Sequence, residues 1–275
     1  MPLAVCATPI GNVEDVTLRV LHELEAADLI LCEDTRHTKG LLDRHGIHAR
    51  LLSYHQHNEA QRTAELLPRL EAGERIALVS DAGLPGVNDP GARLIAAALD
   101  AGAPVTVLPG PSAVETALVA SGLVGERYQF LGYLPRGAKA LGALWSELGG
   151  WGHPAVAFES PRRLPATLRS LAAALPERPV AVCRELTKRF EEVVRGSAAD
   201  VAARFPEPPK GELTLVIGAG APASEPAGAA ETIEAVGAVV ELVGAGIPRR
   251  QAADVVARLA RISRNTLYAE SLKSR

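Results

Sequence analysis

The chain has 275 residues with a formal net charge of −3, and 47% of them are hydrophobic and 22% charged. It has room for two domains of ordinary size, and it holds no apolar run of the roughly 20 residues that would cross a bilayer. These values exclude a membrane-spanning protein and give no sign of a general nucleic-acid binder, so any surface that binds RNA must be local.

Strand-like and helix-like runs alternate along the first part of the chain, which predicts an α/β fold with a largely parallel sheet. Strands are predicted at residues 3–7, 29–32, 76–79 and 105–108. Helices are predicted at residues 15–25, 38–45, 59–70, 92–101 and 113–121.

A second set of elements follows. Strands are predicted at residues 128–131, 155–159, 180–184, 191–195 and 213–217, with the last two antiparallel. Helices are predicted at residues 140–148, 163–174 and 198–205. We therefore expect an N-terminal α/β domain at 1–115 and a second α/β domain at 116–220.

The last part of the chain is predicted to be a helical tail at 229–275, after a linker of small residues at 222–228. Its helices are expected at 229–244 and 249–261, and a third opens at 263–268. From Ala245 onward, seven basic residues stand against two acidic ones, a net charge of +5. This tail is equally compatible with an RNA-contacting module and with a solvated or dimer-forming element.

The segment 80–91, Ser-Asp-Ala-Gly-Leu-Pro-Gly-Val-Asn-Asp-Pro-Gly, is the strongest sign of a ligand site. It follows a buried strand and precedes a helix, and its Gly, Pro and Asp residues give it a fixed shape. Open α/β sheets bind ligands at the carboxyl ends of their strands. Similar loops are predicted at 8–12, 33–38, 55–59 and 109–113.

These loops contain no Gly-x-Gly-x-x-Gly, Walker A or HExxH motif, so a Rossmann dinucleotide site is not indicated. In the loop 33–38, two carboxylates, an Arg and a His could accept a proton and bind a phosphate. The same residues are equally typical of a helix N-cap at Asp34 or Thr35 with a surface ion pair. No metal site is expected, because His55 and His57 have no third ligand at suitable spacing.

Two further expectations concern the cysteines and the N-terminus. Cys6, Cys32 and Cys183 lie in apolar contexts, so we expect buried thiols rather than disulfides. No basic segment precedes the first strand, so we expect no signal peptide and a cytoplasmic location.

Taken in order, these loops resemble the ribosomal RNA small subunit methyltransferase I branch of the tetrapyrrole methylase superfamily. Three later segments agree with it, at 158–161, 184–188 and 210–214, so the resemblance spans 3–218. Leu267 and Tyr268 in the tail also fit. The chain departs from the family pattern at Leu84, where Thr is frequent, and at Arg162, where His is frequent.

The resemblance implies two α/β domains that hold S-adenosylmethionine (SAM) in the cleft between them, in a homodimer. The implied activity is 2′-O-methylation of a cytidine ribose in the decoding region of 16S rRNA, with the small ribosomal subunit as partner. The cofactor-binding residues that it implies are Pro9, Ser80, Asp81, Ala82, Gly83, Ser112 and Ala113 from the first domain and Phe158, Glu159, Glu185 and Thr214 from the second.

The resemblance also suggests roles in catalysis and in RNA binding. Asp34 matches a functional acidic residue of tetrapyrrole-methylating relatives, so we expect it to assist deprotonation of the ribose 2′-hydroxyl, with Glu33 second. That task favours a raised pKa for Asp34. Tyr54 and Tyr133 are the aromatic residues best placed for base stacking, although core packing is the commoner role. RNA contacts are expected from Arg36, His37, His57, Asn58, Glu59, Arg162, Arg163 and Lys188.

Two other functions fit the same fold. A methyltransferase acting on a small tetrapyrrole would share the cofactor, but its first loop should be rich in glycine, and here that loop reads Thr8-Pro9-Ile10. A non-catalytic RNA-binding assembly factor would not need the intact loops at 81–83 and 109–113. A measurement of SAM binding distinguishes the two methyltransferases from the assembly factor. The RNA dependence of methyl transfer then distinguishes the rRNA methyltransferase from the tetrapyrrole methyltransferase.

Overall fold

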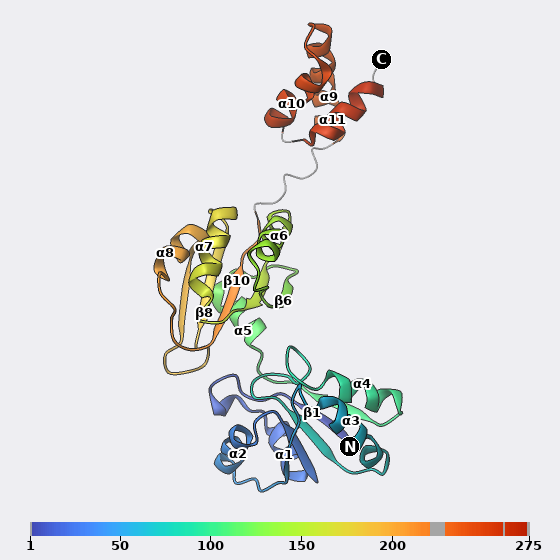
Figure 1. The fold of residues 1–275 in the computed structure, drawn as a ribbon, viewed down its shortest axis with the longest axis vertical. Helices are drawn as coiled ribbons and strands as arrows, with labels where there is room; N and C mark the ends of the chain where they lie inside the picture. Colours follow the sequence, from blue (N-terminus) through green and yellow to red (C-terminus); the bar gives the residue numbers. More distant parts are fainter. Residues whose placement is uncertain (1, 221–228, 261, 274–275) are drawn as a thin grey trace. The chain divides into compact units, whose positions relative to one another are not determined.

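The computed structural model describes residues 2–220, 229–260 and 262–273, in two compact units (Figure 1). The first unit takes in the described chain up to Trp145 and His153–Gly218. The second takes in Ser146–Gly152 and the described chain from Ala219 onward. The predicted linker at 222–228 lies outside the described residues, and the predicted domain boundaries stay a prediction.

Short apolar runs form the first sheet. Its strands are β1 (Leu3–Cys6), β2 (Leu29–Cys32), β3 (Leu51–Ser53), β4 (Ile76–Val79) and β5 (Val105–Leu108). All of them pair in parallel, in the order β3-β2-β4-β1-β5. The predicted parallel sheet is confirmed, and β3, which has only three residues, was missed.

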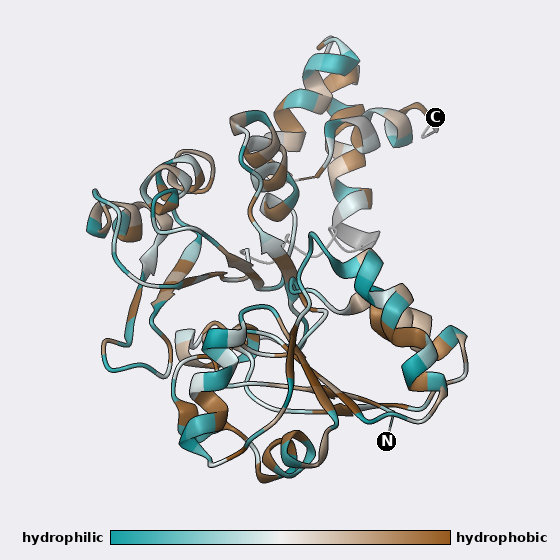
Figure 2. Ribbon diagram, turned by 60° about the horizontal axis from the view of Figure 1, so that its bottom comes forward, coloured by the Kyte–Doolittle hydropathy of each residue, from teal (hydrophilic) through white to brown (hydrophobic). Residues whose placement is uncertain are grey.

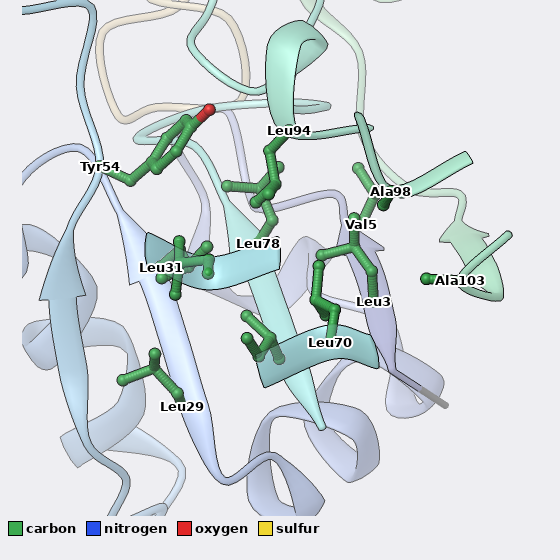
Figure 3. Packing of buried hydrophobic residues seen from close by; sticks show 12 residues of the cluster. Leu3, Val5, Leu29, Leu31, Tyr54, Leu70, Leu78, Leu94, Ala98 and Ala103 are labelled. Carbon is green, nitrogen blue, oxygen red and sulfur yellow. The ribbon is translucent and has the colours of Figure 1, made fainter. Parts of the chain in front are cut away.

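Alternate side chains of this sheet enter two different cores, since successive residues of a strand point to opposite faces. Leu3, Val5 and Leu31 pack with α3 (Glu59–Glu71) and α4 (Ala92–Asp100) (Figure 3). Ala4 and Ile30 pack on the other face with α1 (Leu18–Ala26) and α2 (Thr35–Arg44). Figure 2 shows the strands as hydrophobic and the helices as mixed, which is the expected pattern for a sheet covered on both faces.

Two helices begin at residues other than the predicted ones, because a capping side chain fixes the first residue of each. The first helix begins at Leu18 rather than at 15, because the Thr17 side chain accepts the N–H of Val20 and residues Val13–Asp15 form a separate 3-10 turn. The second begins at Thr35 rather than at 38, because Asp34 caps it.

The second sheet is mixed. Its strands are β6 (Gln129–Tyr133), β7 (Ala155–Phe158), β8 (Pro179–Arg184), β9 (Glu192–Ser197) and β10 (Leu213–Ile217), in the order β6-β7-β10-β8-β9. Only β6 and β7 pair in parallel, and β9 and β10 each pair antiparallel to β8, which confirms their predicted type. The helices of this part are α6 (Ala138–Gly149), α7 (Leu164–Ala174) and α8 (Ala198–Arg204).

The helix α5 (Ala113–Ser121) links the two sheets. Val114, Ala117 and Leu118 pack against β7, β8 and β10, and Ile10, from the turn after β1, joins the same core. The three cysteines are buried and free, as predicted.

The C-terminal segment forms three helices, α9 (Ala229–Gly244), α10 (Arg249–Ala260) and α11 (Arg264–Lys273). They share a core of their own, in which Val239, Ala252 and Leu267 are fully buried. Among the described residues, no helix is both long and apolar enough to cross a membrane.

Candidate functional site

Three loops meet at the carboxyl ends of β1, β4 and β5. The backbones of Thr8 and Gly83 form an antiparallel bridge, with N–H···O distances of 2.8 and 3.0 Å. Gly83 has a φ of +78°, and a Cβ built there would lie 3.8 Å from the Pro111 carbonyl oxygen and 3.9 Å from Ile10 Cγ2. The predicted cofactor loops around Pro9, Gly83 and Ser112 are thus close together.

The loop after β4 is shaped by buried hydroxyl groups. Thr8 Oγ1 donates to the Ser80 carbonyl oxygen at 2.9 Å. Ser80, which is 3% exposed, has its hydroxyl 3.2 Å from the carbonyl oxygens of Ala82 and Gly83. Ser80 therefore holds the loop in shape. The neighbouring Asp81 carboxylate accepts the Asp34 backbone N–H at 3.2 Å, which joins this loop to the one after β2.

Asp34 is the N-cap of α2. Its carboxylate accepts the Arg36 backbone N–H at 2.8 Å and pairs with the Arg36 guanidinium at 3.0 Å. These hydrogen bonds lower the pKa of Asp34 to about 2. The helix cap with a surface ion pair, which the sequence left open as an alternative, is confirmed, and the expected raised pKa is wrong.

A pocket of about 690 Å³ opens beside these loops. Glu33 and Asp89 both lie in its wall. Burial raises the pKa of Asp89 to about 6, and the charges of Glu33 and Asp81 add to this effect. Partial desolvation, followed by the charge of Asp81, raises the pKa of Glu33. The residues that line the pocket are Glu33, Gln56, Glu59, Asn88, Asp89, Pro90, Ala92 and Arg93.

Asp89 is a residue that sequence reasoning did not single out. It belongs to the Gly- and Pro-rich loop after β4, and that loop was the available signal. Its elevated pKa comes first from burial and then from the charge of Glu33, which follows β2, so both causes arise only when the fold is formed.

In the predicted loop 55–59, at the start of α3, the side chains of Asn58 and Glu59 form hydrogen bonds within the protein. Glu59 Oε1 accepts the Gly91 backbone N–H at 3.1 Å and lies 3.2 Å from the buried Tyr54 hydroxyl. Asn58 accepts the His55 backbone N–H at 2.8 Å and donates to the Ser53 carbonyl oxygen at 3.1 Å. Tyr54 is 1% exposed, so it packs in the core and its ring is not available for base stacking.

The carboxylate of Glu159, from the second half of the unit, is completely enclosed. Its oxygens accept the Ser160 backbone N–H at 2.7 Å and the Thr167 hydroxyl at 2.6 Å, and the Arg163 guanidinium lies 3.2 Å away. Arg163 also donates to two carbonyl oxygens, at 2.7 and 2.9 Å. Both side chains thus anchor the start of α7.

Glu185 and Lys188 are also held by partners within the protein. Glu185 Oε1 accepts the Glu212 backbone N–H at 2.9 Å, and Lys188 Nζ lies 3.1 Å from Glu185 and 2.7 Å from Glu212. The bond from the Glu212 backbone, together with Lys188, lowers the pKa of Glu185. The charge of Lys188 is therefore paired within the protein.

Of the remaining predicted residues, some are buried or bonded within the protein and others are exposed. Thr214 is 5% exposed in β10 opposite Phe158. Ser112 occupies the N-cap position of α5, and its hydroxyl donates to the Glu115 carboxylate rather than to the helix backbone. By contrast, the Arg36 side chain is 90% exposed, and Tyr133 is 64% exposed with its ring 5.6 Å from that of Phe158. The other exposed residues predicted to contact RNA are His37, His57 and Arg162.

Comparisons with known proteins agree on one family. The family model of tetrapyrrole (corrin/porphyrin) methylases matches residues 2–202. A Synechocystis protein named ribosomal RNA small subunit methyltransferase I is 41% identical over 273 residues, which are 98% of this chain and 97% of that protein. A protein of the same name from Mesorhizobium japonicum is 40% identical and covers 98% of this chain and 91% of its own length.

Solved structures show the same fold. The methyltransferase CobJ matches with a TM-score of 0.62 and 20% identity, over 79% of this chain and 93% of its own. A uroporphyrin-III C-methyltransferase from Thermus thermophilus, solved with S-adenosylhomocysteine, matches with a TM-score of 0.55 and 18% identity, over 78% and 96% of the two chains.

Proposed function

The chain belongs to the tetrapyrrole methylase family of SAM-dependent methyltransferases, and from this premise we propose that it methylates the 2′-hydroxyl of a cytidine ribose in the decoding region of 16S rRNA. The observation that supports this substrate is the 41% identity, over nearly the whole chain, to a relative named ribosomal RNA small subunit methyltransferase I. The two solved methyltransferases described above are 20% and 18% identical, so they indicate the fold and not the substrate.

The residues at the strand ends suit a ligand with positive charge. SAM supplies an activated methyl group on a sulfonium cation. We propose that Pro9, the loop 80–83, Ser112 and Ala113 hold it from the first half of the unit. The Asp81 carboxylate, with Glu33 and Asp89 close by, makes the local charge negative, which suits that cation.

The predicted residues of the second half would act mainly through the shape of the site. Glu159 and Glu185 have their carboxylates occupied by internal partners, so we assign them the task of fixing loop backbones. Phe158 and Thr214 lie side by side on β7 and β10 and supply a wall. Such residues exclude water and align the reacting atoms, which is the main requirement of methyl transfer.

A carboxylate that removes the proton from the ribose 2′-hydroxyl would accelerate the reaction, typically by about 10²–10⁴-fold. Asp34 and Glu33 are the two candidates. Glu33 is favoured here, because its pKa is raised and it lines the pocket, whereas the low pKa of Asp34 makes it a weak base. Asp34 would then have a structural role, as the N-cap of α2 and the ion-pair partner of Arg36.

The proposed function is tested by incubating the protein with labelled SAM and purified small ribosomal subunits. The product nucleosides are then separated and identified by mass. A single 2′-O-methylated cytidine is the expected product. Label on a different nucleotide, or on a base, would refute the assignment. Sedimentation of the same preparation tests the proposed homodimer, and cell fractionation tests the proposed cytoplasmic location.

A further inference from the structure

The loop between β8 and β9 has a strained but well-fixed backbone. Glu185 has a φ of +51° and Thr187 a φ of +65°, values that residues other than glycine rarely adopt. Lys188 bonds to two carboxylates, and Glu191 accepts the Thr187 backbone N–H at 2.6 Å. Strain of this kind persists where surrounding contacts enforce it, and it is frequent at binding sites.

This loop is pressed against the turn that follows β1. The Asn12 backbone N–H donates to Thr187 Oγ1 at 2.9 Å. A Cβ at Gly11 would lie 2.6 Å from Lys188 Cγ and 2.8 Å from the Leu186 carbonyl oxygen, so only glycine permits the approach. The same turn begins at Thr8, which is bridged to Gly83, so the loop lies beside the proposed cofactor loops.

The tip of the loop exposes an aromatic ring next to a cation. Phe190 is 65% exposed, and the Arg189 guanidinium carbon lies 5.6 Å from the centre of its ring. In the part of the chain that the structure describes, Arg189 forms no ion pair, whereas Arg163 and Lys188 do. An exposed phenylalanine contributes little to folding, because its ring stays in water.

We propose that Arg189 and Phe190 bind the RNA substrate, with the ring stacking on an unpaired base and the guanidinium meeting a backbone phosphate. Aromatic rings and arginine planes are the usual platforms for splayed single-stranded RNA. The contact would position the strand next to the proposed cofactor site. This inference rests on the proposed function, since it takes the RNA as the methyl acceptor.

The test compares Phe190→Ala with Phe190→Trp in the full chain. We expect Phe190→Ala to raise the KM for small subunits about tenfold, the order of one stacked base, with kcat and SAM affinity unchanged. Phe190→Trp should have a KM close to that of the unaltered protein, because the larger ring still stacks on a base. Leu18→Ala is the matched control, since Leu18 is 73% exposed on α1 and its removal should leave the KM unchanged.

Binding of protein-free 16S rRNA fragments distinguishes the possible partners. We expect Phe190→Ala to lose affinity for the fragment as it does for subunits. An unchanged KM, a loss confined to complete subunits, or a change in oligomeric mass would each overturn the proposal, the last two in favour of a protein contact. If the unaltered protein transfers no methyl group, the proposed function fails, and the binding measurement still decides whether Phe190 contacts RNA.

Discussion

The backbone N–H of Asn12 donates a hydrogen bond to the Thr187 hydroxyl at 2.9 Å, across 175 positions of sequence. The bond joins the turn after β1, in the first sheet, to the loop after β8, in the second. Because the turn also carries Pro9 and the loop carries Glu185, this contact helps to hold cofactor-binding candidates from the two sheets close together.

Replacing Gly11 tests this junction. Gly11→Ala would place a Cβ 2.7 Å from Thr187 Oγ1 and 2.8 Å from a backbone oxygen, so the loop must shift. We expect a loss of about 1–3 kcal/mol in the free energy of unfolding, measured with urea, and weaker SAM binding by calorimetry.

Gly40→Ala is the matched control. Gly40 lies inside α2, and a Cβ there would meet no atom within 4 Å. Alanine in a helix is favoured over glycine, so this variant should gain about 0.5–1 kcal/mol and bind SAM normally. Equal stabilities for the two variants would show that the contact at Gly11 is not tight.

Glu159 provides a second test, because it separates a structural role from direct cofactor contact. Glu159→Ala would leave the Thr167 hydroxyl and the Ser160 N–H without their buried acceptor. We expect the cofactor-free protein to lose about 2–4 kcal/mol of unfolding free energy. Glu192→Ala breaks only the exposed 2.9 Å pair with Arg184 and should cost less than about 1 kcal/mol. Normal stability of Glu159→Ala would instead indicate a role in binding alone.

Much of the fold could be predicted because the strands are short apolar runs between turn residues. Strands β4 and β5 have the predicted bounds for that reason. The strand β3 was missed because Leu51–Ser53 pairs along one side only, at the edge of the sheet, and carries no run long enough to detect.

The site was less predictable than the fold. Sequence placed Asp34 and Glu33 in one loop, but the choice between cap and proton acceptor depends on where Arg36 and Asp81 point in space. The internal partners of Glu159 and Lys188 were equally hidden, because Thr167 and Glu212 carry no signal that they face those side chains.

The choice of proton acceptor predicts a loss of kcat for one of two neighbouring carboxylates and no loss for the other. Glu33→Gln keeps the shape of the pocket wall but cannot accept a proton, so we expect kcat at saturating SAM to fall about 10²-fold or more. Asp34→Asn keeps an N-cap side chain, and its kcat should stay close to that of the unaltered protein. Single-turnover methyl transfer to small subunits measures both. A larger loss in Asp34→Asn would reverse the assignment.

The pKa of Asp89 gives a prediction for stability against pH. Its pKa is raised from 3.8 to about 6, so between these values the folded protein retains a proton that the unfolded chain has lost. The stability that this proton provides is fully present below pH 3.8 and is lost as the pH rises through 6. Asp89→Asn resembles the protonated form at every pH. The variant should therefore be the more stable protein at pH 7–8, and its advantage should disappear towards pH 4.

Urea unfolding at a series of pH values measures this difference, and Glu33→Gln provides a second check on its cause. The charge of Glu33 contributes to the raised pKa of Asp89. Without that charge, the loss of stability should move to lower pH, because Asp89 then gives up its proton more readily. A stability difference between Asp89→Asn and the unaltered protein that stays constant from pH 4 to 8 would mean that Asp89 has the same pKa in the folded and the unfolded chain. In that case Glu33 and Asp89 would not form a coupled pair in the pocket.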